Sequence, residues 1–139
     1  MFRKFIRAGV VATLGMTAML FAYGAATAAP LGKDELPDIK TIMKKGHAKT
    51  DGYIALTKTA AKDGKWDDAV KYAKTLDVFG EALGKNKPPK GDAESWKKLT
   101  DKYAAATKAA LKGAEAKDAK AVNAALGMIN CGECHKVHK

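Results

Sequence analysis

The chain has 139 residues, with 25 Lys or Arg against 15 Asp or Glu, and its formal net charge at pH 7 is +10. This length supports a single domain once a leader is removed. Its two cysteines, Cys131 and Cys134, lie in one short segment, so they exclude a disulfide framework that joins distant parts of the chain; a bridge between them would stabilise the fold little.

The first 28 residues have the three parts of a secretory signal: a basic start, a long apolar stretch and a small-x-small cleavage pattern. The basic residues are Arg3, Lys4 and Arg7, and the cleavage pattern is Ala26-Thr27-Ala28. A membrane anchor is the alternative, but the stretch contains several Gly and Thr residues and ends in a cleavage site. We therefore expect residues 1–28 to be removed and residues 29–139 to form one domain without stable membrane insertion.

The predicted exported domain stays basic. Loss of the signal removes three basic residues and no acidic ones, which leaves a net charge of +7. The lysines are spread over every segment and arginine is absent after Arg7, which argues against a nucleic-acid partner, because readers of phosphates and base edges favour the bidentate guanidinium group. The pattern fits either a diffuse surface for an acidic protein partner or simply solvated helix faces.

The first predicted helix follows a short leader, residues 29–36. Pro37 suits a first helical turn, and Asp38 places negative charge near the positive end of the helix dipole. Apolar residues at spacings of three and four then predict a helix down to Asp63-Gly64. These residues are Ile39, Ile42, Met43, Gly46, Tyr53 and Leu56. Gly46 and Gly52 weaken the middle of this helix.

Three further helices are predicted. The second is the clearest amphipathic helix and extends from near Trp66 to Gly84. After a Pro-Pro-Lys-Gly loop, Asp92 is a suitable N-cap for the third helix, which ends at Gly113. The fourth begins near Asp118 and runs into the C-terminal Cys-Gly-Glu-Cys-His segment. The apolar stripe of the third helix contains Trp96, Leu99, Tyr103, Ala106 and Ala110. That of the fourth contains Val122, Leu126 and Ile129.

The fold class predicted by these patterns is all-α, four helices with short connections. No stretch shows the two-residue alternation or the Val, Ile and Thr density of strands. The inward positions are largely Ala, which bury little apolar area per residue. A large apolar cofactor inside the bundle would supply the missing volume.

The segment Cys131-Gly132-Glu133-Cys134-His135 has the C-x-x-C-H pattern of covalent haem attachment. Residues three apart share a face of a helix, so both thiols can reach the two vinyl groups at one edge of a porphyrin. His135, the residue after the second cysteine, can bring its imidazole to the iron. We therefore expect Cys131 and Cys134 to hold one haem c and His135 to bind its iron.

Two other interpretations of the motif are weaker. A thioredoxin-like redox pair would stand at the start of a helix after a strand, whereas this pair is predicted at the end of a helix in a chain without strands. A zinc site needs four ligands, and Cys131, Cys134, His135 and His138 are crowded into one short segment.

The second axial position of the iron must be filled from another helix. His138 is excluded because it lies on the same helix, and on the same side of the porphyrin, as His135. Met43 and His47, one turn apart on the first helix, remain. Met43 is either a thioether ligand or ordinary core packing, and His47 is best interpreted as a solvated polar residue.

A C-x-x-C-H motif within ten residues of the C-terminus, after the last of four helices, resembles the class II c-type cytochromes, the cytochrome c′ family. The resemblance covers residues 29–139 and also draws on Ile42-Met43-Lys44 and on the Trp-containing helices separated by a Pro-Pro loop. It implies an antiparallel four-helix bundle with the haem inside near one end and His135 as the solvent-side axial ligand. A homodimer through the first two helices is compatible with it.

The same family divides at the sixth iron site. Low-spin members fill it with a methionine from the first helix, and Met43 stands where that methionine would. High-spin members leave the site empty and bind nitric oxide or carbon monoxide. One departure from the family pattern is His138, which stands where an aromatic residue is common, and its role stays open.

The sequence thus predicts a periplasmic electron carrier and not an enzyme, with iron cycling between Fe(II) and Fe(III) and an acidic redox partner. The alternative is a five-coordinate haem protein that binds small gases and in which Met43 only packs. A helical metal-handling protein without haem is a third hypothesis.

Overall fold

The computed structural model describes residues 36–139, and the predicted signal and most of the leader lie outside this range. Six helices follow one another: α1 Ile39–His47, α2 Tyr53–Lys62, α3 Trp66–Lys85, α4 Ala93–Glu115, α5 Ala119–Gly127 and α6 Cys131–His138. The described part of the chain contains no strand. The all-α class is therefore confirmed.

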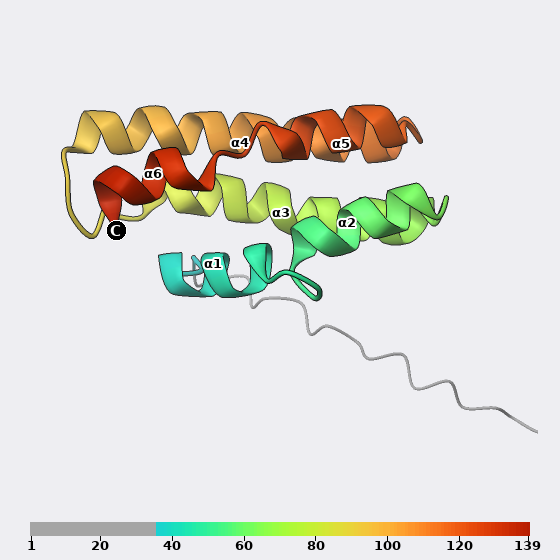
Figure 1. Cartoon of the computed structure of the whole chain (residues 1–139), viewed down its shortest axis with the longest axis horizontal. Helices are drawn as coiled ribbons and strands as arrows, with labels where there is room; N and C mark the ends of the chain where they lie inside the picture. Colours follow the sequence, from blue (N-terminus) through green and yellow to red (C-terminus); the bar gives the residue numbers. More distant parts are fainter. Residues whose placement is uncertain (1–35) are drawn as a thin grey trace, which may run out of the picture. The chain divides into compact units, whose positions relative to one another are not determined.

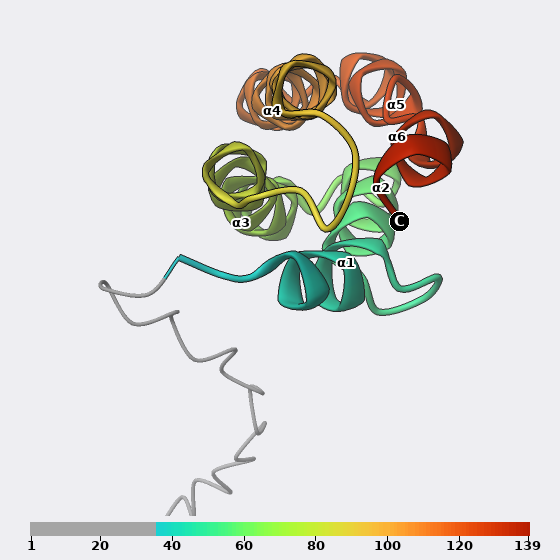
Figure 2. The ribbon, with the colours of Figure 1, turned by 90° about the vertical axis from the view of Figure 1, so that its left-hand side faces the viewer.

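The helices form a bundle of four rows. One row contains α1 and then α2, the next two are α3 and α4, and the last contains α5 and then α6 (Figure 1). Successive rows run in opposite directions, and the end-on view shows them around a common centre (Figure 2). At one end of the bundle the four rows form a closed ring of contacts. There α3 packs on α4, α4 packs on α5, and α2 packs on both α3 and α5. The other end is built from α1, α6 and the adjoining parts of α3 and α4.

The prediction of one continuous helix down to Asp63 is wrong. The helix stops at His47, and a second one starts at Tyr53 after a turn. Gly52 explains this turn, because its amide donates to the carbonyl of Ala48 at 3.2 Å and a Cβ on Gly52 would lie 2.5 Å from the backbone of Ala48. Only glycine permits such a close approach.

The predicted fourth helix is also divided. α5 ends at Gly127, and α6 starts at Cys131 as a separate helix. Between them, the Asn130 side chain accepts a hydrogen bond from the backbone N–H of Glu133 at 3.2 Å and caps α6. The C-x-x-C-H motif therefore occupies its own short helix instead of the last turns of a long one.

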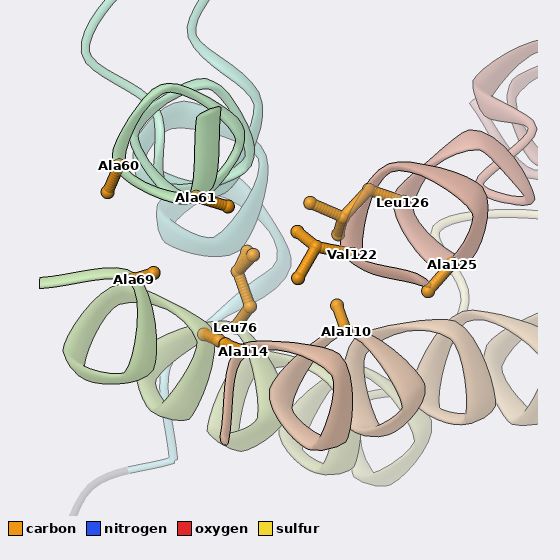
Figure 3. Close-up of a cluster of buried hydrophobic side chains, with 10 residues drawn as sticks. Ala60, Ala61, Ala69, Leu76, Ala110, Ala114, Val122, Ala125 and Leu126 are labelled. Atoms are coloured by element: carbon orange, nitrogen blue, oxygen red, sulfur yellow. The ribbon is translucent and has the colours of Figure 1, made fainter. Parts of the chain in front are cut away.

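The closed end of the bundle has a core made mostly of alanine. In Figure 3, Leu76, Val122 and Leu126 point into the space between the helices, and alanines from four helices surround them. Small residues let the helices approach closely, since a Cβ on Gly113 of α4 would lie 2.9 Å from the backbone nitrogen of Val122 on α5. The helices at this end are therefore packed closely against one another.

The other end has a second, more aromatic core. Its buried members are Ile42, Phe79, Ala82, Leu83, Trp96 and Tyr103. Met43, Ile129 and Cys134 pack against this cluster as partly buried residues. The C-x-x-C-H helix is therefore attached to the end of the bundle where larger side chains replace alanine.

Within residues 36–139, no helix combines the length and apolar character needed to cross a membrane.

Candidate functional site

A cavity of about 440 Å³ lies at the aromatic end of the bundle. This volume falls within the range of about 300–1,000 Å³ that is typical of sites for small molecules and cofactors. Its apolar walls include Ile39, Leu83, Pro89, Trp96, Leu99 and Ile129. The cavity therefore lies beside the aromatic core and not beside the alanine-rich core, so the alanine content of the sequence did not predict its location.

The C-x-x-C-H helix forms one wall of this cavity. Cys131, Cys134, His135 and His138 all line it, at the i, i+3, i+4 and i+7 spacing of a single helical stripe. Cys131 and His135 are exposed, Cys134 is half-buried and His138 is buried. Both cysteines are free thiols. The three residues predicted for haem attachment thus face the same cavity.

The two thiols differ in their surroundings. Burial raises the pKa of the Cys134 thiol, and the nearby Cys131 and Glu133 raise it further because their negative charge opposes a second thiolate. Cys134 is therefore held in its neutral thiol form more strongly than an isolated cysteine.

The first helix forms another wall and contributes Met43 and His47, one turn apart. The structure therefore brings the predicted distal ligand Met43 to the same cavity as the C-x-x-C-H motif. The interpretation of His47 as a solvated residue is wrong. Its ring is half-buried, and its Nε2 lies 3.0 Å from the hydroxyl oxygen of Tyr103 on α4.

Burial keeps this imidazole and its phenol partner neutral. Burial lowers the pKa of His47, and the positive charge of His135 lowers it further. Burial also raises the pKa of Tyr103, with a smaller contribution from Cys131. Because both groups stay uncharged near neutral pH, the cavity acquires a hydrogen-bonded polar pair at low electrostatic cost. Sequence reasoning placed Tyr103 only in an apolar stripe, and no sequence signal linked it to His47.

The rim of the cavity carries lysines. Lys102 and Lys139 line it, and Lys102 Nζ lies 3.3 Å from a carboxylate oxygen of Glu133 on α6. Both partners of this ion pair are about half exposed, so solvent screening makes it a weak tether.

The residues around the cavity fit a haem better than a bare metal ion. Among residues 36–139 no group of three or more His, Cys, Asp or Glu is placed to hold a metal ion. A haem iron needs only axial ligands from the protein. A large, flat, apolar group with two attachment points suits an apolar cavity with both cysteines and His135 along one wall.

Comparisons with known proteins identify no relative: no family model matches the chain, and neither the curated proteins nor the solved structures contain a match. The resemblance to class II cytochromes therefore depends on the residues themselves, above all on Cys131, Cys134 and His135.

Proposed function

We propose that this chain is a monohaem c-type cytochrome of the class II kind that carries electrons in the periplasm. The observation that carries the proposal is that Cys131, Cys134, His135 and Met43 all line one cavity of about 440 Å³. These residues come from the two ends of the described chain. Two thiols, an imidazole and a thioether around one apolar cavity are the side chains that attachment of a haem would use.

When bound, the haem supplies reversible one-electron chemistry at its iron. The thiols of Cys131 and Cys134 would each form a thioether with it, and the spacing of three residues keeps both sulfurs on one side of α6. The imidazole of His135 would be the proximal ligand. Met43, from α1, would offer its thioether from a different wall.

The protein would set the reduction potential through its own side chains. A thioether ligand raises the potential compared with a second imidazole, and an apolar lining shields the site from water. The neutral state of His47 and Tyr103 means that this pair adds no fixed charge to the cavity. The apolar walls and Met43 thus act in the same direction, toward the reduced form.

The rim and the net charge of the chain support an acidic redox partner. Lys102 and Lys139 line the cavity, and Lys136 is exposed on α6. A positive surface speeds encounter with an acidic protein without requiring tight binding. This would suit a carrier that must release its partner after each transfer.

The direct test is to express the full chain in a host with c-type haem attachment machinery and to analyse the exported product. We expect one haem per chain by intact mass, a haem c signal in the alkaline pyridine spectrum, and a haem that resists acid-acetone extraction. Cys131→Ser and Cys134→Ser together should abolish attachment. An exported polypeptide with only the mass of its amino acids would overturn the proposal.

A gas-binding function is the second candidate, and one observation favours it. Met43 packs against the buried aromatic cluster that contains Ile42 and Phe79, and this contact would explain a methionine here without any metal bond. In that case the iron would be five-coordinate and free to bind carbon monoxide or nitric oxide. The ferric spectrum separates the two functions, because a methionine-ligated iron is low-spin and a five-coordinate iron is high-spin.

A further inference from the structure

His138 is the only buried residue of α6, and its exposed fraction is 3%. Its ring nitrogens have partners on two other segments. Nδ1 lies 2.8 Å from the carbonyl oxygen of Lys90 in the α3–α4 loop, and Nε2 lies 3.1 Å from the hydroxyl of Ser95 in the first turn of α4. The ring also packs against the ring of Trp96 in a T-shaped arrangement, with centroids 5.2 Å apart.

These contacts fix the tautomer of the imidazole. A carbonyl oxygen can only accept, so Nδ1 must carry the hydrogen and donate it to Lys90. In the neutral ring, Nε2 then accepts from the hydroxyl of Ser95. Both nitrogens are satisfied, which a buried imidazole requires. A phenylalanine at this position could keep the contact with Trp96 but could make neither hydrogen bond.

The loop is shaped to receive this ring. Gly91 has φ +84°, a backbone conformation that favours glycine, and a Cβ there would lie 2.7 Å from Nδ1 of His138. In Figure 2 the α3–α4 loop crosses the end of the bundle toward α6. The loop therefore closes over the C-terminal helix at the point where His138 enters.

The contacts continue from His138 to the first helix. Trp96 donates its indole N–H to the carbonyl of Asn86 at 2.8 Å, and the amide of Asn86 donates to the carbonyl of Pro37 at 3.1 Å. Pro37 directly precedes Asp38, the N-cap of α1. One chain of contacts thus joins the helix that bears His135 to the helix that bears Met43.

The C-terminal helix also contacts the bundle through the half-buried Cys134, which packs against the aromatic core. α6 has only eight residues and is separated from α5 by a short non-helical segment. The ion pair between its Glu133 and Lys102 is exposed to solvent. Because His138 shares a helical stripe with Cys131, Cys134 and His135, fixing its ring also fixes the rotation of α6 about its axis. The other three side chains are then turned toward the cavity.

We propose that His138 is a positioning residue, a C-terminal clasp that locks α6 so that Cys134 and His135 face the cavity. The clasp consists of His138, Lys90, Gly91, Ser95 and Trp96. The role toward haem rests on the proposed function, whereas the locking of α6 is a property of the chain itself. An imidazole serves here because it offers one donor and one acceptor on opposite sides of a flat ring.

The first test measures amide hydrogen exchange in the exported chain without haem. In His138→Phe, exchange within α6 should rise at least about fivefold, because the carbonyl of Lys90 and the hydroxyl of Ser95 lose their partner. Exchange in α3 and in the second half of α4 should stay unchanged. His138→Gln, which keeps a donor and an acceptor, should recover part of the protection, and Lys136→Ala, an exposed residue of α6, should behave as the native chain.

Native protection of α6 in His138→Phe would overturn the clasp. Equal loss in His138→Phe and His138→Gln would overturn its hydrogen-bonded form. The second test uses the haem-loaded chain, where His138→Phe should weaken the circular dichroism of the haem absorption band and His138→Gln should partly restore it. Failure of the native chain to acquire haem would overturn the proposed function but would leave the exchange comparison to decide the clasp.

Discussion

His47 and Tyr103 join the first row of helices to the third, with the imidazole Nε2 3.0 Å from the phenol oxygen and the two ring centroids 5.5 Å apart. The residues are 56 positions apart in the chain and both line the cavity. The short helix α1 ends at His47, so this contact holds the last residue of the helix against α4. Among the residues that the structure describes, this is the only side-chain hydrogen bond between α1 and α4, and it lies inside the candidate site.

We expect Tyr103→Phe to lower the free energy of unfolding by about 1 kcal/mol, because the half-buried imidazole loses its partner. Urea denaturation of the chain without haem measures this loss. Tyr72→Phe is the matched control, since it removes the same oxygen from a half-buried tyrosine of α3 that does not line the cavity. Equal losses in the two variants would show that the hydrogen bond to His47 contributes nothing.

The stability of the chain without haem should fall as the pH drops below neutrality. Burial lowers the pKa of His47 in the folded state below the ordinary value of 6.5, so the unfolded chain binds this proton more readily. The titration of His47 therefore contributes nothing to the free energy of unfolding well above pH 6.5. As the pH falls through 6.5 it lowers this free energy, and the loss levels off below the pKa of the folded state.

The measurement is the unfolding free energy of the native chain minus that of His47→Gln, between about pH 5 and 8, where most carboxyl groups are already ionised. This difference should decrease as the pH falls, because the native chain loses stability that the variant keeps. A difference that is constant across this range would contradict the lowered pKa.

Gly91→Ala should destabilise the fold more than Gly64→Ala. Both glycines have positive φ, +84° and +71°, so both variants carry a backbone cost of about 1–2 kcal/mol. The space around Gly64 is open, whereas a Cβ at Gly91 would overlap the ring of His138. We expect the overlap to add about 1 kcal/mol or more, measured by thermal or urea unfolding.

A double-mutant cycle checks the cause of that difference. In a His138→Ala background, the excess cost of Gly91→Ala over Gly64→Ala should shrink, because the two ring atoms of His138 nearest to a Cβ are gone and only the carbonyl oxygen of Val137, 3.1 Å away, remains. If the excess destabilisation persists in this background, its cause is the loop backbone and not the ring of His138.

In the haem-loaded protein, Met43→Ala should convert a low-spin ferric spectrum to a high-spin one and remove the charge-transfer band of a sulfur ligand. Met128→Ala is the matched control, because Met128 also lines the cavity but is 64% exposed. A low-spin spectrum that changes only when His47 is also replaced would assign the sixth position to His47. A native spectrum that is already high-spin would support the gas-binding function.

Electron transfer to an acidic partner should slow as the salt concentration rises, because the lysines at the rim act over a distance that salt screens. Lys136→Glu together with Lys139→Glu should lower the rate at low salt and flatten its salt dependence, as stopped-flow kinetics would show. The same two changes at Lys58 of α2 and Lys108 of α4, which lie neither on the C-x-x-C-H segment nor in the cavity lining, serve as the charge-matched control. Rates that do not depend on ionic strength would remove the acidic partner from the proposal.

The starts of α4 and α5 were predictable because they are encoded locally. Asp92 accepts a hydrogen bond from the amide of Ser95 at 2.7 Å, and Asp118 accepts from the amides of Lys120 and Ala121. Each cap uses atoms within three residues of the aspartate, so the sequence pattern contains all that is needed. Of the two missed breaks, the one after His47 is of a different kind, whereas the one after Gly127 is followed by a cap of this same local kind, in which Asn130 accepts from the amide of Glu133 at 3.2 Å. At the first, the helical stripe continues through the break, and only a Cβ clash at Gly52 reveals that the chain turns.

The sequence by itself determined the helical class and the helix starts after Asp92 and Asp118, and it predicted the residues that would attach a haem, because each depends on spacings of a few positions along one helix. Only the tertiary structure decided that Met43 and the C-x-x-C-H helix face one cavity, that His47 is bonded to Tyr103, and that His138 is a clasp. The contact of His138 with Ser95 joins residues 43 positions apart, that of His47 with Tyr103 joins residues 56 positions apart, and Met43 is still further along the chain from the C-x-x-C-H helix. Such contacts depend on how the rows of the bundle pack, and no local pattern of residues specifies them.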